Sequence, residues 1–359
     1  MKNIFYFLII ISLFTACQGE VNQKPNFVII LVDDLGWADV RANYPESFYE
    51  TPNLDQMASE GLRFTQAYAA HPVCSPTRAA LMTGQHPNRL GITDWIPGYD
   101  KFEERRPIIT PSINNELALE ETTLAEKFKD NGYQTFFIGK WHLGEEEKYW
   151  PENQGFDVNI GGWRVGAPQL KKEISNGYYS PYGNPKLADG PEGEYLTDRL
   201  TNESLQLIKE NNKEPFLLYL SFYSVHTPIQ PAPKRYDYFL DKKENMIVSG
   251  EQAKYKPEGE GQTKLIQDNA AYASMVAAMD ENVGRILQEL KAQGLDDNTW
   301  VILTSDNGGL STLYGEGAPT SNGPLRAGKG WCYEGGIRVP MLIKGPGIKN
   351  PGTAPDLPV

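Results

Sequence analysis

The stretch FVIILV, residues 27–32, is where the interpretation of this chain begins, because six apolar residues follow one another without a polar break. The run is rich in β-branched residues and predicts a strand that is buried on both faces, as in a parallel sheet beneath helices. It ends at Asp33 and Asp34. Two adjacent carboxylates repel each other and are costly to bury, so this strand end predicts a bound cation or a nearby Lys or Arg, with a solvated acidic turn as the alternative.

Further along the chain, predicted helices alternate with predicted strands. The pattern predicts helices at residues 52–60, at 124–130 after the capping residues Thr122 and Thr123, from the capping residues Thr197 and Asp198 through residue 208, and at 272–290. It predicts strands at residues 64–69, 134–139, 215–221, 300–304 and 339–343. Alternation of this kind indicates the α/β fold class.

A second stretch, HPVCSPTRAALMTG at residues 71–84, predicts a short helix with a cysteine at its start. Pro76 suits a first helical position and Ser75 can cap just before it. The positive end of the helix would favour an anion beside Cys74, and Arg78, one turn along, adds a guanidinium suited to an oxyanion. A free cysteine buried at a strand-to-helix corner is the alternative.

Other polar groups also lie just beyond the predicted strands, where ligands bind in parallel α/β sheets. Lys140 and His142 are two residues apart, so an extended backbone points both to one spot. The remaining groups of this kind are His226, Asp306 and Asn307. Lys329 follows in a Gly-rich loop before the last predicted strand. Carboxylate and amide oxygens from two strand ends suit calcium or magnesium and do not suit zinc. Ordinary surface loops are the alternative for each group alone.

Composition limits the class of protein. With 359 residues, of which 40% are hydrophobic, the chain can bury a sizeable core. A formal net charge of -12 argues against a protein that binds nucleic acid or acidic membranes in general. The three cysteines, Cys17, Cys74 and Cys332, imply no disulfide framework.

Residues 1–17 are interpreted as an export signal, with Lys2 before an apolar run that is too short to span a membrane. The ending Thr15-Ala16-Cys17 resembles a bacterial lipoprotein box, in which Cys17 would carry the lipid. We therefore expect a periplasmic or outer-membrane-anchored lipoprotein that meets the membrane only through its lipid, with plain secretion as the alternative. Residues 18–25 are a polar linker.

The pattern C-x-P-x-R at residues 74–78 resembles the activation motif of the type I sulfatases, members of the alkaline-phosphatase-like superfamily. The segments VDDLG, GKWHLG, VHTP, SDNG and GK resemble the successive sulfatase blocks, in the right order; they begin at residues 32, 139, 225, 305 and 328. The resemblance implies a mixed, largely parallel sheet sandwiched by helices, with a catalytic domain at residues 26–346. It also implies that residues 347–359 begin a smaller C-terminal subdomain that is truncated here.

The same resemblance implies the chemistry of the site. A formylglycine-generating enzyme would oxidise Cys74 to formylglycine, whose hydrate attacks sulfur. One divalent cation, calcium with magnesium as the alternative, would be bound by Asp33, Asp34, modified Cys74, Asp306 and Asn307. The sulfate and the hydrate would be held by Arg78, Lys140 and Lys329. His142 would help to regenerate the aldehyde, and His226 with Lys329 would assist the leaving group.

The expected activity is hydrolysis of sulfate esters on carbohydrate, in polysaccharide degradation, with other sulfate esters as further substrates. Export and the tyrosines of the loop-rich residues 145–195, among them Tyr178, Tyr179 and Tyr182, favour sugars, because tyrosine rings can stack on them; a plain surface excursion is the alternative for this segment. Two further alternatives stay open: a phosphonate or phosphate monoester hydrolase of the same superfamily, and a non-catalytic exported protein that binds glycans.

Overall fold

The computed structural model describes residues 24–98, 112–246 and 253–359. The expected export signal, its Cys17 and residues 18–23 of the expected linker lie outside these ranges. Within them, no helix combines the length and the apolar character needed to cross a bilayer.

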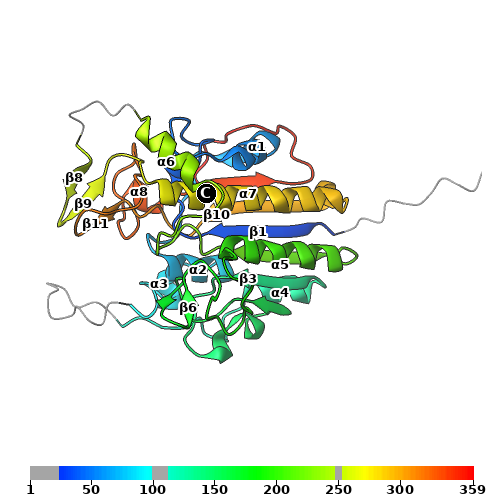
Figure 1. The fold of residues 1–359 in the computed structure, drawn as a ribbon. Coiled ribbons are helices and arrows are strands. Elements are labelled where there is room, and N and C mark those ends of the chain that lie inside the picture. Colours follow the sequence, from blue (N-terminus) through cyan, green and yellow to red (C-terminus); the bar gives the residue numbers. More distant parts are fainter. Residues whose placement is uncertain (1–23, 99–111, 247–252) are drawn as a thin grey trace, which may run out of the picture.

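A central sheet organises the described residues, with strands in the order β2-β12-β10-β1-β7-β3-β4 (Figure 1). Its members are β1 (Asn26–Val32), β2 (Leu62–Phe64), β3 (Gln134–Gly139), β4 (Val158–Ile160), β7 (Phe216–Ser221), β10 (Thr299–Ser305) and β12 (Met341–Lys344). Strands β10, β1, β7, β3 and β4 are parallel, whereas β12 is antiparallel to both β10 and β2. The expectation of a mixed, largely parallel sheet is confirmed.

The register of the parallel strands brings their carboxyl ends together. Val32 of β1 lies opposite Ser305 of β10, and Leu31 lies opposite Ser221 of β7. Ser221 in turn lies opposite Gly139 of β3. Four neighbouring strands therefore end at one edge of the sheet, and the residues that follow them emerge side by side.

Both faces of the sheet are covered by helices, as the apolar run of β1 predicts. Val28, Ile30 and Val32 point to one face, and alternate residues such as Leu31 point to the other. The helices on the first face are α1 (Pro52–Glu60), α5 (Leu196–Glu210), α6 (Tyr236–Glu244) and α7 (Ala270–Ala292). The second face is covered by α2 (Cys74–Thr83), α3 (Pro87–Leu90) and α4 (Leu124–Asp130).

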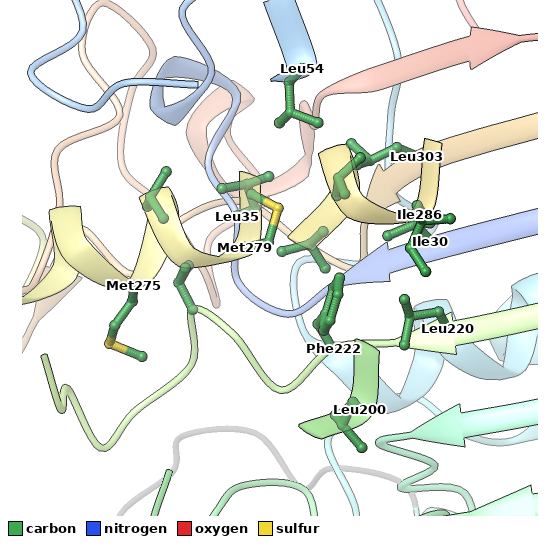
Figure 2. Packing of buried hydrophobic residues seen from close by; sticks show 14 of the residues in the cluster. Ile30, Leu35, Leu54, Leu200, Leu220, Phe222, Met275, Met279, Ile286 and Leu303 are labelled. Atoms are coloured by element: carbon green, nitrogen blue, oxygen red, sulfur yellow. The ribbon is translucent and has the colours of Figure 1, made fainter. Parts of the chain in front are cut away.

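Figure 2 shows the core on the first face, where Ile286 of α7 packs close to Ile30 of β1 and Leu303 of β10 lies nearby. Figure 1 shows α1 near β12 and α4 near β3, at opposite ends of the sheet. A long amphipathic α7 thus lies across the middle of the sheet, as the apolar stripe at residues 272–290 predicts.

Two predicted helix starts have different outcomes. Thr123 caps α4 through a reciprocal pair of bonds with Glu126, as expected. The predicted cap at Thr197 and Asp198 is wrong, because α5 begins at Leu196 and both residues lie inside its first turn. Their side chains are used by tertiary partners instead, since Thr197 bonds Ser224 and Asp198 accepts a bond from Asn282.

The strand expected at residues 64–69 overlaps β2 only at Phe64. Beyond it, Gln66 forms an isolated bridge with Pro358 and Tyr68 forms one with Arg338. The remaining short elements are β5 (Leu170–Lys171), β6 (Ser175–Asn176), β8 (Tyr255–Glu258), β9 (Gly261–Lys264), β11 (Thr312–Leu313) and α8 (Glu334–Ile337). Single 3-10 turns are η2 (Trp37–Asp39), η4 (Glu147–Tyr149), η5 (Pro151–Asn153) and η6 (Asp296–Asn298).

Candidate functional site

The start of α2 carries Cys74, which is almost fully buried. The helix begins at Cys74, two residues before the predicted first position at Pro76. Gly84, with φ of 68°, ends it as predicted. The predicted capping role of Ser75 is wrong, because Ser75 lies within the helix. Its hydroxyl donates to the carbonyl of His142 (3.2 Å) and accepts from the amide of Ile96 (3.1 Å), which joins α2 to two other segments.

His142 places a ring nitrogen beside the sulfur of Cys74, with 3.4 Å between Nδ1 and Sγ. Its Nε2 lies 2.7 Å from the carbonyl oxygen of Ile96, which can only accept, so Nε2 carries the hydrogen. Burial lowers the pKa of His142 well below its usual value, and the nearby Lys140 lowers it further. The neutral ring therefore turns an unprotonated Nδ1 toward position 74.

Arg78, one helical turn after Cys74, is buried at the carboxyl ends of the strands. Its Nε and Nη2 atoms lie 2.9 and 2.8 Å from Oδ2 of Asp306, and Nη1 donates to Ser221 Oγ (2.7 Å) and to the carbonyl of Lys140 (2.9 Å). Burial lowers the pKa of Arg78, but the carboxylates of Asp306 and Asp33 outweigh it and raise the pKa above its usual value. Arg78 is thus a fixed positive charge.

Two lysines pair with the carboxylates that follow β1. Lys140 Nζ lies 2.7 Å from Asp33 Oδ2, and both side chains are fully buried. Lys329 Nζ lies 2.6 Å from Asp34 Oδ1, although almost 300 residues separate the two in the chain. The prediction that the adjacent carboxylates need cations is confirmed.

Asp306 and Asn307 follow β10 and touch the same carboxylates. Oδ1 of Asp306 accepts the backbone amide of Asp34 (3.1 Å), and Nδ2 of Asn307 donates to Asp34 Oδ1 (2.8 Å). Burial would raise the pKa of Asp306, but Arg78 and the two lysines outweigh it and hold the pKa well below its usual range. The two strand ends form one polar cluster.

The two carboxylates after β1 are affected differently by this cluster. Burial raises the pKa of Asp33, and the carboxylates of Asp306 and Asp34 add to the rise despite the ion pair with Lys140. Burial would also raise the pKa of Asp34, but Lys329 and His226 outweigh it and lower the pKa. At Asp33 the effect of burial on the pKa therefore outweighs the ion pair, whereas at Asp34 the neighbouring positive charges outweigh burial.

His226, five residues after β7, lies at the rim of the cluster. Its Nδ1 is 2.8 Å from the carbonyl oxygen of Thr227 and so carries the hydrogen of a neutral ring. Burial and then Lys329 lower the pKa of His226 to about 3. The unprotonated Nε2 faces Asp34 Oδ2 at 3.7 Å, so two acceptors point at each other across a gap that suits a proton or a cation.

The donor set fits a divalent cation. Oδ1 of Asp33 and Oδ1 of Asn307 are buried and have no hydrogen-bond partner within the described part of the chain. Asp33, Asp34 and His226 each offer a ligand atom within 4.8 Å of the others. A set dominated by oxygens suits calcium or magnesium. Cys74 lies beside His142 and is not a member of this close group.

Lys140 and His142 both belong to the site, as expected, but the backbone that carries them is not extended. Trp141 between them does pack into the core. His142, however, has φ of 60°, as Asp34 has φ of 63°, so neither belongs to an extended segment. Left-handed backbone is unfavourable for residues with a Cβ, and its use at two site residues fits a backbone bent to aim side chains.

Three polar residues that sequence reasoning did not single out support the cluster. Ser221 ends β7 and accepts from Arg78, and Ser305 ends β10 and accepts the amide of Leu35 at 3.0 Å. Both sit at strand ends, a position that could have revealed them. Asn322 lies in a loop without such a signal, yet its Nδ2 bonds the carbonyl oxygens of residues 309, 327 and 335 and so ties the Asp306 loop to the Lys329 loop.

Comparison with known proteins places this site in a family. The family model described as Sulfatase matches residues 25–356, nearly the whole chain. The chain belongs to the sulfatase family. It is 32% identical to a protein named sulfatase from Formosa agariphila, covering 98% of this chain and 69% of that protein. It is 33% identical to the N-acetylgalactosamine-6-sulfatase of Mus musculus, covering 95% of this chain and 61% of that enzyme.

Among solved structures, Ps i-CgsB in complex with k-i-k-neocarrahexaose matches with a TM-score of 0.72 and 30% identity, over 94% of this chain and 69% of that one. The expected alkaline-phosphatase-like fold of the sulfatases is thereby confirmed. The chain spans about three fifths of the length of the mouse relative.

Proposed function

We propose that this protein hydrolyses sulfate esters on carbohydrate. One observation carries the proposal: three buried or nearly buried cations, Arg78, Lys140 and Lys329, converge with buried carboxylates beside Cys74 and His142. Three carboxylates, those of Asp33, Asp34 and Asp306, offset these three cations. A divalent cation would leave the cluster with two positive charges, which suits an anionic sulfuryl group.

Each residue of the cluster has a chemical role in this proposal. Asp33, Asp34, Asp306 and Asn307 would hold the divalent cation, which supplies Lewis-acid stabilisation of charge on sulfate oxygens. Calcium is proposed, and magnesium is the alternative. Oxidation of Cys74 to formylglycine by a formylglycine-generating enzyme would supply a nucleophile that no encoded side chain offers. Arg78, Lys140 and Lys329 would bind the sulfuryl oxygens and keep water from screening them.

The two histidines would move protons. The unprotonated Nδ1 of His142 faces position 74 and can accept a proton from a hydroxyl group there. His226 presents Nε2 at the rim, and a proton taken up by Nε2 can pass from there to the oxygen of the departing sugar. Lys329, paired with the same Asp34, would stabilise negative charge on that oxygen.

Sulfate release from a panel of esters tests the proposal. The full chain, coexpressed with a formylglycine-generating enzyme and supplied with calcium, is assayed on N-acetylgalactosamine 6-sulfate, sulfated carrageenan oligosaccharides, 4-nitrophenyl sulfate and 4-nitrophenyl phosphate. We expect sulfate release from saccharides. Activity confined to 4-nitrophenyl sulfate would exclude the carbohydrate substrate, and faster release of phosphate would favour the phosphoester alternative.

Cys74→Ala should abolish turnover, and Cys332→Ala, which removes the other cysteine of the described residues, is the matched control. Mass spectrometry of the peptide around Cys74 measures the conversion to formylglycine. An unmodified thiol in protein from its native host would instead favour the glycan-binding alternative.

We also propose export and a lipid anchor on Cys17. The proposal is supported by the Thr15-Ala16-Cys17 sequence after the apolar run. Cys17→Ala should move the protein from the membrane fraction to the soluble exported fraction, as measured by fractionation and immunoblotting. A membrane fraction that is unchanged in this variant would contradict the lipid anchor.

A further inference from the structure

A pocket is lined in part by residues 163 and 167–169, which belong to a segment in contact with His142. Its walls include Trp163, Tyr182 and Tyr223. The segment contacts His142 at two points: the carbonyl of Trp163 accepts the amide of His142, and a Cβ at Gly166 would overlap the His142 ring. The same segment thus contributes to the pocket wall and contacts the proposed proton acceptor.

The wall residue Tyr223 also links the pocket to the charges of the cluster. Burial raises the pKa of Tyr223, a side-chain hydrogen bond with Trp163 and the charge of Arg78 lower it, and the charge of Asp33 raises it. Two residues of β7 and its extension therefore serve both places: Ser221 bonds Arg78, and Tyr223 forms a wall of the pocket.

The pocket is lined by three aromatic residues and a few polar groups, which is the usual lining of a ligand site. Tyr182 and Tyr223 are buried, so Trp163 presents most of the exposed aromatic surface. The hydroxyl of Tyr182 bonds Glu194, and that of Tyr223 bonds within the 163–165 segment, so their tips are already satisfied by the protein. The hydroxyl of Ser175, in contrast, is buried without a hydrogen-bond partner within the described ranges. A hydroxylated ligand would supply that missing bond.

A lysine of the hairpin formed by β5 and β6 also lines this pocket. Lys171 lines the pocket, is exposed, and forms no ion pair with any described residue. Its neighbour Lys172 also is exposed but lies 3.8 Å from the carboxylate of Glu173. Ile174, 60% exposed, adds apolar surface to the same rim. The mouth thus combines one unpaired positive charge with apolar contact area.

We propose that this pocket binds the sugar next to the one that carries the cleaved sulfate, and that Lys171 pairs with an anionic group, sulfate or carboxylate, on that second sugar. The inference rests on the proposed carbohydrate sulfatase function. It implies that the protein prefers sulfated oligosaccharides with a second charged sugar over single sulfated sugars. Tyr178, which the sequence suggested for sugar stacking, does not serve here, because its ring is fully buried against Tyr195 and its hydroxyl bonds the carbonyl of Tyr223.

Binding measurements on the full-length Cys74→Ala protein test the inference without turnover. Isothermal titration with k-i-k-neocarrahexaose and with a chondroitin 6-sulfate hexasaccharide is compared with titration by N-acetylgalactosamine 6-sulfate. Lys171→Ala should weaken hexasaccharide binding about five- to tenfold, as expected for one charge-assisted contact, with a smaller effect on the monosaccharide. Ala167→Leu, which fills the pocket, should weaken hexasaccharide binding at least as much. Lys172→Ala is the matched control and should bind like the parent protein.

The outcomes separate this inference from the proposed function. If the parent enzyme releases sulfate but Lys171→Ala and Ala167→Leu both bind hexasaccharides like Lys172→Ala, the pocket inference is wrong and the sulfatase function stands. If hexasaccharides bind and the two variants weaken binding but no ester is cleaved by modified enzyme, the pocket stands and catalysis does not. Absence of binding to every saccharide would overturn both.

Discussion

Arg78 shows how much structure one buried charge can hold. Its guanidinium bonds Asp306, Ser221 and the carbonyl of Lys140, and so joins three of the strand ends to α2. Replacing it by alanine would leave the carboxylate of Asp306 buried with less compensation. Loss of one partner from a buried ion pair typically costs about 3–5 kcal/mol.

We therefore expect Arg78→Ala to lower the free energy of unfolding by about 3–5 kcal/mol, measured by urea denaturation. Lys344→Ala is a matched control, because Lys344 pairs with Glu60 at the surface and should cost less than about 1 kcal/mol. Equal losses in the two variants would contradict the view that the Arg78 contacts hold the site together.

At the same scale, the polar residues of the cluster were largely predictable from sequence, because most of them follow an apolar run and strand ends of parallel sheets converge. What could not be predicted is how they pair. Lys329 could equally have been a surface lysine, and only the fold brings it 2.6 Å from Asp34. Asn322 had no signal at all, since its role depends on three loops meeting around one amide.

At the scale of elements, two positions require glycine for different reasons. Gly139 ends β3 with φ of 101°, and a Cβ there would overlap the carbonyl oxygen of Ser221 on β7. Gly84 ends α2 with φ of 68°, and a Cβ there would meet nothing within 4 Å. Both have left-handed backbone, but only Gly139 is also in close contact with a neighbouring strand.

Gly84→Ala should cost about 1–2 kcal/mol of folding free energy, the penalty for a Cβ in left-handed backbone. Gly139→Ala should cost at least about 2 kcal/mol more, because the parallel pairing of β3 with β7 must also give way. Thermal unfolding followed by circular dichroism measures both. Similar losses in the two variants would show that β3 and β7 can separate at little cost.

Asp280 of α7 joins two helices, because its carboxylate forms hydrogen bonds with the first turn of α1. Its carboxylate accepts the amides of Asn53 and Leu54 at 3.1 and 2.8 Å. Burial raises the pKa of Asp280 from 3.8 to about 6 in the folded protein, despite these bonds. The folded state therefore holds more protons than the unfolded state between these two values, and stability falls as the pH rises through them.

Comparing the wild type with Asp280→Asn isolates this effect, because the other titrating groups, including Asp39, are common to both proteins. The wild-type advantage over the variant should fall by up to about 3 kcal/mol between pH 4 and pH 6.5 and stay level above that, since each pKa unit corresponds to about 1.4 kcal/mol. Urea denaturation at several pH values measures it. A difference that rises with pH would mean that the bonds to α1 outweigh burial.

Some boundaries of elements escaped prediction for a common reason. Ser75 and Thr197 have the side chains of capping residues, yet both lie inside helices because their hydroxyls bond distant segments. The predicted alternation of helices and strands was nevertheless correct, because it depends on long apolar patterns. A helix cap, in contrast, depends on a single hydroxyl, which can form a hydrogen bond with a distant segment instead.

For the whole molecule, the proposed cation should act as part of the fold. Residues from two strands separated by more than 270 positions, such as Asp33 and Asn307, supply its ligands, and an ion that binds only the folded state stabilises it. At 100 times the dissociation constant the gain is about 2.7 kcal/mol. Calcium should raise the melting temperature of the wild type, and a chelator should reverse the rise.

Asn307→Ala should remove most of this calcium-dependent shift, and Asp297→Asn, at an exposed position, should retain it. A wild-type melting temperature that does not respond to calcium or magnesium would contradict the proposed metal site, independently of any activity assay.

The pairing of β1 with β10 also has a consequence during synthesis. β1 leaves the ribosome early, but residues 26–32 find their partners at residues 299–305 only after some 270 further residues have been made. Until then one side of the most apolar strand in the sheet has open backbone groups, an edge that invites pairing with other chains. Yield of folded protein should therefore depend on translation speed and on chaperones that shield the nascent amino-terminal strand.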